Sequence, residues 1–258
     1  MTDVSPWHED HGFKYQLFPA KTGKAKSVVI YMHGVDDYAH LPDDQLKYLQ
    51  DKVPDADVIL LQAPMPVEKS SIYPEPKGYT WFPYGGSVVK QVKAWVAHIF
   101  NKLPVANQVE AFAHAQLAQR GLNESNLAYY GHSMGGIMAL EAGLTGKHEV
   151  AAIVTCSSVV PPFTHIHNHS KVFLQMGEVD PLFNQPRKPL PEKGFLKKAF
   201  TFAMNNFGLR HELTKLTLEK AHVPFTEKIY PGMGHVQTYE TWVDGVNFIA
   251  KALAKPAA

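Results

Sequence analysis

The sequence predicts an α/β fold in which a mainly parallel central sheet is covered by helices on both faces. Short apolar runs alternate with longer amphipathic runs along the chain, which is typical of successive strand–helix–strand units. Several of the short runs are apolar on both faces, and this favours central strands that are buried on each side. The 258 residues are enough to bury a large core, so we expect residues 1–258 to form one domain.

The expected elements follow this alternation from the N-terminus onward. Strands are expected at Lys26–Met32, Asp57–Leu61, Asn126–Tyr130, Val150–Cys156, Lys171–Met176 and Phe225–Tyr230. Helices are expected at Asp43–Lys52, Val88–Asn101, Asn107–Arg120, Met134–Leu144, Leu209–Ala221 and Gln237–Ala254.

Two segments, 88–103 and 184–207, interrupt the alternation and are predicted to be helical insertions. The first is helix-like and ends just before Pro104. The second contains several phenylalanines beside lysines, a pattern that fits either a lid or interfacial patch, or an ordinary surface helix packed on the body.

Composition and charge narrow the classes of protein. The chain is 45% hydrophobic and 19% charged, which is the profile of a compact globular protein. Its formal net charge of +1, with acids and bases interspersed, gives no electrostatic footprint for nucleic acid. The first 14 residues lack a signal-peptide pattern, and no window approaches the roughly 18 consecutive apolar residues of a membrane span, so we expect a cytoplasmic protein. The single cysteine, Cys156, excludes an internal disulfide and a cysteine-based zinc site.

A Gly-x-Ser-x-Gly motif at residues 131–135 makes Ser133 a candidate nucleophile. An apolar strand runs into the motif and a helix-forming stretch runs out of it, which is the strand–elbow–helix setting of a nucleophilic serine. The glycines leave room for a strained turn that exposes Oγ, and the backbone N–H of Met134 at the helix start can face a developing oxyanion. Because the bare motif arises by chance about once in ten chains of this length, its context carries the prediction.

A serine nucleophile needs a base and an orienting carboxylate, which follow it in the order acid, then histidine, in the α/β-hydrolase fold. Asp180 and His235 each follow a predicted strand, so both are expected at the carboxyl edge of the sheet, where catalytic groups gather. Glu178 is the alternative carboxylate. We predict that Ser133 attacks an acyl carbon, that His235 is the base, and that Asp180 orients the imidazole.

A second oxyanion donor is predicted where the strand at Lys26–Met32 ends in His33-Gly34. Gly34 permits a turn that presents the backbone N–H of Val35 toward the site, opposite Met134. One such donor is worth about 3–4 kcal/mol of transition-state stabilisation. His33 itself is predicted to be a hydrogen-bonded structural residue rather than a base.

With these residues in place, the chain resembles the carboxylesterase/phospholipase family that includes the acyl-protein thioesterases. The resemblance covers about residues 26–252 and rests on His33–Asp37, Gln62–Pro64, Tyr79–Phe82, Gly131–Gly136, Gly177–Leu182 and Tyr230–His235. It implies an α/β hydrolase that cleaves small-molecule carboxylic esters or thioesters without metal or organic cofactor, and it supports the same triad and oxyanion donors. Two departures are Asp36, where the family often has glycine, and Met134, where glutamine commonly follows the nucleophile.

For several features the sequence alone allows two interpretations. Tyr79, Trp81 and Phe82 fit either an acyl pocket or core packing, and His132 beside the nucleophile is a further pocket candidate. The alternating histidines of residues 165–169 fit a zinc site only if companion ligands approach, and a solvated loop is the better interpretation. The same fold also carries lipases, peptidases, polymer esterases and non-catalytic binding proteins, and oligomeric state is left open.

Overall fold

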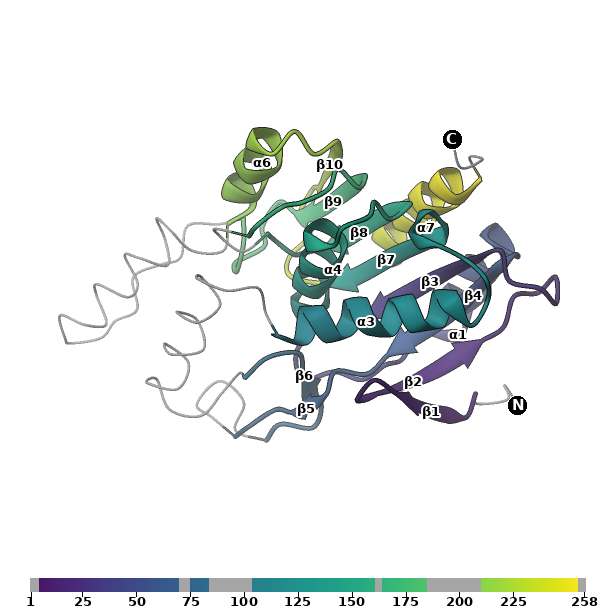
Figure 1. The fold of residues 1–258 in the computed structure, drawn as a ribbon. Coiled ribbons are helices and arrows are strands. Elements are labelled where there is room, and N and C mark those ends of the chain that lie inside the picture. The colour runs from purple at the N-terminus through teal and green to yellow at the C-terminus, as the bar shows by residue number, and fades with distance from the viewer. Residues whose placement is uncertain (1–4, 70–74, 84–103, 161–163, 185–209, 255–258) are drawn as a thin grey trace.

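One eight-stranded sheet forms the centre of the computed structural model, which describes residues 5–69, 75–83, 104–160, 164–184 and 210–254 (Figure 1). In spatial order its strands are β1 (Trp7–Asp10), β2 (Phe13–Phe18), β4 (Ala56–Leu61), β3 (Ser27–Met32), β7 (Leu127–His132), β8 (Ala152–Cys156), β9 (Val172–Gly177) and β10 (Phe225–Tyr230). β2 pairs antiparallel with β1 and β4, and the other six strands pair in parallel. The sheet is therefore mainly parallel, as predicted.

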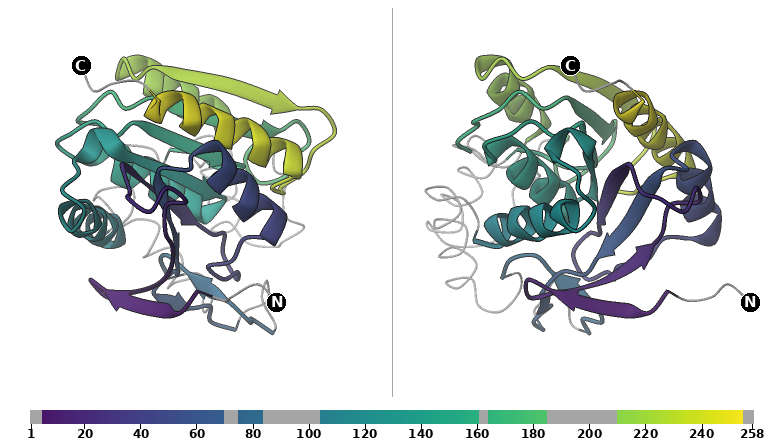
Figure 2. Two further views of the ribbon diagram at one scale, coloured as in Figure 1. Left: turned by 90° about the vertical axis from the view of Figure 1, so that its right-hand side faces the viewer. Right: turned by 45° about the vertical axis from the view of Figure 1, so that its right-hand side comes forward.

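Helices cover both faces of this sheet, which confirms the predicted layers. α1 (Asp43–Lys52) and α7 (Tyr239–Leu253) lie side by side on one face (Figure 2). α3 (Pro104–Ala118) and α4 (Met134–Thr145) pack together on the other face. α6 (His211–Lys220) lies near β10, to which it is joined by a contact between His211 and Glu227.

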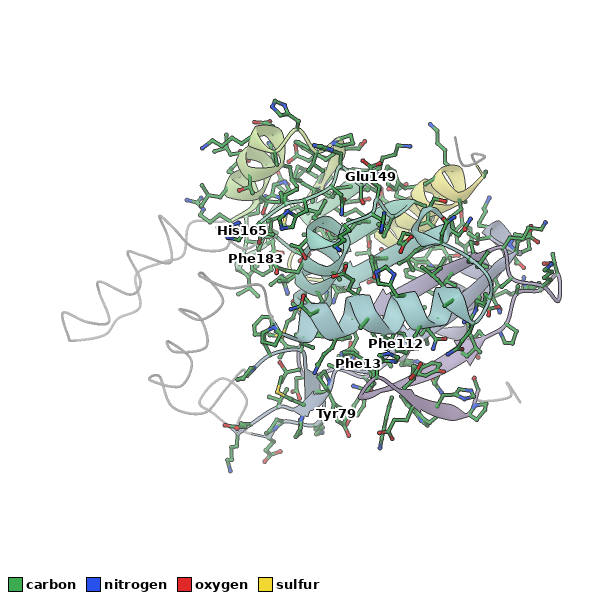
Figure 3. All side chains as sticks on the ribbon, in the orientation of Figure 1. Phe13, Tyr79, Phe112, Glu149, His165 and Phe183 are labelled. Carbon is green, nitrogen blue, oxygen red and sulfur yellow. The ribbon has the colours of Figure 1, made fainter. Side chains whose placement is uncertain are left out.

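The core consists of two layers separated by the sheet. Every residue of β3, β4, β8 and β9 is buried, which accounts for their two-sided apolar pattern. Between β2 and α3, the rings of Phe13 and Phe112 meet edge-on with centroids 5.9 Å apart (Figure 3). This contact packs α3 against the β2 side of the sheet.

Element boundaries differ from the predictions where local chemistry decides them. The described part of α3 starts at Pro104 rather than Asn107, and proline suits the first turn of a helix. α7 begins at Tyr239 rather than Gln237, because the side chain of Thr238 caps it by accepting the backbone N–H of Thr241. β1 and β2 were not predicted, and neither were the 3-10 turn η1 (Glu124–Asn126) and the short pair β5 (Met65–Pro66) and β6 (Tyr79–Thr80).

Some predicted elements lie wholly or partly outside the residues that the structure describes. The predicted insertion at 88–103, with its helix Val88–Asn101, lies outside the described residues, and so does the insertion at 184–207 apart from Asn184. Leu209, the predicted start of α6, also lies outside them. Within the described ranges, no helix combines the length and apolar character that crossing a membrane requires.

Candidate active site

Ser133 lies on a strained turn between β7 and α4. Its φ of 53° and ψ of −119° are unusual for a residue with a side chain, and its backbone N–H donates to the carbonyl of Cys156 at 2.9 Å. A Cβ at Gly131 would lie 2.3 Å from the carbonyl oxygen of Gly135, and one at Gly135 would lie 2.1 Å from that of Met32. Both glycines of the motif are therefore required by space.

Ser133, His235 and Asp180 form a continuous chain of hydrogen bonds. Ser133 Oγ lies 2.8 Å from His235 Nε2, although the two residues are 102 positions apart in the sequence. His235 Nδ1 lies 2.8 Å from Asp180 Oδ2. The aspartate side chain is fully buried, whereas the imidazole keeps 19% of its surface exposed. The structure thus brings the three predicted residues together, with the histidine reachable from outside.

Asp180 is held as a carboxylate. Its Oδ1 accepts the backbone N–H groups of Leu182 and Phe183 at 2.8 and 3.1 Å. Burial raises the pKa of Asp180, but the hydrogen bond and charge of His235, together with these two amides, outweigh it and hold the pKa below its usual value. An ionised carboxylate only accepts hydrogen bonds, so Nδ1 of His235 carries the proton and Nε2 accepts from the Ser133 hydroxyl.

Glu178, the alternative acid, has a different contact. Its Oε2 accepts the backbone N–H of Gly232 at 2.9 Å, on the loop that carries His235. Glu178 therefore anchors the histidine loop, while Asp180 is the carboxylate bonded to the imidazole.

The loop after β3 lies against the serine. A Cβ at Gly34 would lie 3.5 Å from Ser133 Cβ, so Val35 directly follows a residue that touches the elbow. The close approach of Gly135 to Met32 brings the start of α4 to the same place. Among the described residues, the backbone N–H groups of Val35 and Met134 make no turn or loop hydrogen bond to another backbone carbonyl.

His33 is a structural residue, as predicted. Its Nδ1 donates to the carbonyl of Gly34 at 2.7 Å, and its Nε2 accepts from the amide of Ala63 at 3.0 Å and the side chain of Gln62 at 2.9 Å. Burial lowers the pKa of His33 to about 4, against the opposing effect of its hydrogen bond to Gly34. The ring is neutral at pH 7, as its acceptor role requires.

His132 lies beside His235, with ring centroids 5.7 Å apart. Burial, and then the proximity of His235, lower the pKa of His132 to about 4, so this ring is neutral as well. The residue is partly exposed, while its Nε2 is buried without a hydrogen-bond partner among the described groups. This pocket candidate therefore adjoins the candidate base.

The predicted pocket aromatics have different environments. Trp81 is fully buried, and its indole N–H donates to the carbonyl of His33 at 2.8 Å. A side chain without accessible surface favours the core interpretation of Trp81 over the pocket interpretation. Phe82 and Tyr79 are partly exposed and pack against the core, so Phe82 remains a candidate.

Two contacts at the site were not predicted. The ring of Phe183 meets that of His235 edge-on, with centroids 5.3 Å apart. Thr80 Oγ1 lies 3.1 Å from the sulfur of Met134. Thr80 belongs to the Tyr79–Phe82 landmark, but nothing in the sequence signals a contact between this segment and the elbow.

Residues 164–170 have no regular secondary structure, and His165, His167 and His169 are exposed, which agrees with a solvated loop. Among the residues that the structure describes, no three or more histidine, cysteine or acidic side chains are arranged to hold a metal ion. Burial raises the pKa of the Cys156 thiol to about 12, as suits a core residue.

Comparisons with known proteins point to one family. Residues 15–221 match the phospholipase/carboxylesterase family. The structure is similar to esterase PE8, with 20% sequence identity, a TM-score of 0.69, and coverage of 93% of this chain and 99% of that one. It is also similar to the carboxylesterase of Bacillus cereus, with 16% identity, a TM-score of 0.62, and coverage of 93% of this chain and 94% of that one. For the carboxylesterase of Mesorhizobium loti the identity is 15%, the TM-score is 0.62, and the coverage is 98% of this chain and 100% of that one.

No protein of curated function shows significant sequence similarity to the chain. The solved structures, at these identities, show the fold, and the family match over most of the sequence shows the relationship. The chain belongs to the phospholipase/carboxylesterase family of α/β hydrolases.

Proposed function

We propose that this protein is a serine esterase that hydrolyses carboxylic esters of small to medium acyl chains through an acyl-serine intermediate on Ser133. The observation that carries the proposal is the unbroken hydrogen-bond chain from Ser133 through His235 to Asp180. Family membership supports ester hydrolysis, and the hydrogen-bond chain supports the serine mechanism. Thioesters are a second substrate class for the same chemistry.

In the acylation step, Ser133 Oγ attacks the carbonyl carbon of the ester while its proton passes to His235 Nε2. Asp180 stabilises the imidazolium that forms. The tetrahedral oxyanion accepts hydrogen bonds from the backbone N–H groups of Val35 and Met134, the second of which lies at the positive end of α4. His235 then returns the proton to the leaving alkoxide, and an alcohol departs.

In the deacylation step, His235 takes a proton from water, and the hydroxide attacks the acyl-serine carbonyl. The second tetrahedral intermediate uses the same two backbone donors. It collapses with transfer of the proton to Ser133, which releases the carboxylic acid and restores the hydroxyl. The chain supplies the nucleophile, the base, the carboxylate and the two oxyanion donors, and water is the second reactant.

We further propose that His132 and Phe82 contact the substrate beside the reacting carbonyl. Both are partly exposed, and the carbonyl of Phe82 accepts from the hydroxyl of Thr80, which contacts Met134. The low pKa of His132 keeps its ring uncharged at neutral pH. An uncharged imidazole and an aromatic ring suit a neutral ester better than a charged substrate.

Covalent labelling by a fluorophosphonate tests the nucleophile. The wild-type protein should be labelled, and Ser133→Ala should abolish the label. His235→Ala should lower turnover by several orders of magnitude while the protein stays folded. A folded wild type that takes no label would instead indicate a binding protein, and near-normal turnover of His235→Ala would show that the base is misassigned.

A substrate panel tests the reaction class. Oxygen esters, thioesters and amides with matched acyl groups of increasing length should be compared at equal enzyme concentration, with Ser133→Ala as the blank. We expect short and medium oxygen esters to turn over fastest. Preference for amides, long-chain lipids or polymeric esters would contradict the proposal and favour a peptidase, a lipase or a polymer esterase.

A further inference from the structure

Residues 77–81, which include β6, contact both of the loops that carry the proposed oxyanion donors; we call this segment the brace. We propose that the brace positions the oxyanion hole, with Asp36 fixing the Val35 side and Thr80 fixing the Met134 side. The inference rests on the proposed function, because it assigns positioning residues to that reaction.

Asp36 is clamped to the brace by its side chain and its backbone. Its Oδ1 accepts the backbone N–H groups of Lys77 and Gly78 at 2.8 and 2.7 Å, and its own N–H donates to the carbonyl of Tyr79 at 2.9 Å. The residue has a φ of 58°, a conformation that aspartate and asparagine tolerate better than most side chains. These three hydrogen bonds hold a strained residue directly after Val35.

The brace and the loop touch through their backbones. A Cβ at Gly78 would lie 2.3 Å from the carbonyl carbon of Asp36 and 2.5 Å from the amide nitrogen of Asp37. The amide of Tyr79 donates to the carbonyl of Asp37 at 3.1 Å. Because no side chain lies between the two segments, a displacement of the brace moves the peptide next to the N–H of Val35.

The other end of the brace reaches the nucleophile elbow. Thr80 is 1% exposed, and its Oγ1 lies 3.1 Å from Met134 Sδ and 2.8 Å from the carbonyl oxygen of Phe82. Trp81 holds the end of β3 through the carbonyl of His33. A single short segment therefore fixes the two donors relative to each other, which matters because such donors act only when they are already aligned with the oxyanion.

Substitutions at Asp36 separate the effect of its side-chain hydrogen bonds to the brace from the effects of backbone strain and of charge. Glycine accepts the positive φ but removes the acceptor oxygen. Asparagine keeps an oxygen for Lys77 and Gly78 and tolerates the same φ, but removes the charge. At Thr80, valine keeps the shape and loses the hydroxyl, while serine keeps the hydroxyl.

The experiment measures kcat and KM of the full chain on the best ester of the panel, with active sites titrated by fluorophosphonate so that kcat refers to functional molecules. Asp36→Gly should lower kcat by about 10- to 100-fold with KM within about 3-fold, since the donors are misaligned rather than removed. Asp36→Asn should stay within about 3-fold of wild type. Thr80→Val should lower kcat by about 3- to 10-fold, and Thr80→Ser should not.

The inference is overturned if Asp36→Gly keeps the wild-type kcat per titrated site. It is overturned equally if Asp36→Asn falls as far as Asp36→Gly, because charge rather than the clamp would then be responsible. A loss confined to thermal stability and to the number of titratable sites would show a merely structural role. A wild type without turnover would overturn the proposed function as well, whereas the other outcomes overturn the positioning role alone.

Discussion

Replacing Gly135 by alanine tests whether the close packing of α4 against β3 sets both stability and activity. The new Cβ would lie 2.1 Å from the carbonyl oxygen of Met32, about 1.3 Å short of the 3.4 Å at which ordinary contact begins, and 2.4 Å from that of His33. Both obstacles are backbone atoms at the end of a buried central strand. No side chain can rotate away, so the start of α4 or the end of β3 must move.

The expected cost follows from two opposing terms. Overpacking of a rigid core costs about 1–3 kcal/mol, whereas alanine favours a helix over glycine by about 0.5–1 kcal/mol. The two terms leave a net cost of about 0–2.5 kcal/mol, and because both clashing atoms belong to the backbone we expect the upper part, about 1–2.5 kcal/mol, for Gly135→Ala. The same displacement separates the Met134 N–H from the Val35 N–H, so kcat should fall by about 10- to 100-fold, less than the full loss of one donor.

Urea unfolding and steady-state kinetics measure these two effects. Gly234→Ala is the matched control, because a Cβ there meets no heavy atom within 4 Å although the residue adjoins His235. The control should keep its unfolding free energy within about 1 kcal/mol of wild type. Wild-type stability together with wild-type kcat in Gly135→Ala would refute the reasoning.

Three further predictions concern the groups around the serine. Asp180→Asn should lower kcat by up to about 10⁴-fold in a protein with unchanged circular dichroism, because an amide stabilises the wrong tautomer of His235; normal kcat would contradict this. Trp81→Phe leaves the carbonyl of His33 without its donor and should cost about 1–3 kcal/mol in urea unfolding. Neutral His33 should contribute fully to the free energy of unfolding above pH 6.5, and this contribution should be lost as the pH falls from 6.5 toward about 4. The reason is that the histidine of the unfolded chain takes up a proton at a higher pH than the buried histidine of the folded protein. His33→Asn should lose less stability than wild type across that window, and an equal loss would count against the assignment.

The predicted helices and strands are most accurate where the residues of one segment determine its structure on their own. α1 was predicted to the residue, Asp43–Lys52, because its amphipathic pattern begins and ends with charged residues that suit the helix dipole. β1, in contrast, is exposed or half-exposed along its length and has no apolar pattern. It is a strand because it pairs with β2, and such pairing cannot be seen within a four-residue window. β2 did contain a usable signal, since Phe13 and Tyr15 alternate with exposed Lys14.

The candidate site was predictable to the extent that topology dictates it. Parallel strands place their carboxyl ends at one edge of the sheet, so Ser133, Asp180 and His235 could be expected to lie near one another from their positions after three strands. The role of Trp81 could not be predicted, because an aromatic side chain lines a pocket or fills a core according to the surface that its neighbours leave uncovered. Here the rings of Phe13 and His33 lie against it, and the indole N–H donates to the carbonyl of His33 in the loop after β3.

The distance between Asp180 and His235 depends on contacts between two loops, and no sequence motif predicts these contacts. A Cβ at Gly177 would lie 2.2 Å from the carbonyl oxygen of Met233, and the amide of Val179 donates to that same carbonyl at 3.1 Å. These backbone contacts, together with the hydrogen bond from the Gly232 N–H to the side chain of Glu178, join the loop after β9 to the loop after β10. Glu178 and Asp180 therefore have different roles. Glu178 fixes the position of the loop that carries His235, and Asp180 forms the hydrogen bond to the imidazole of His235.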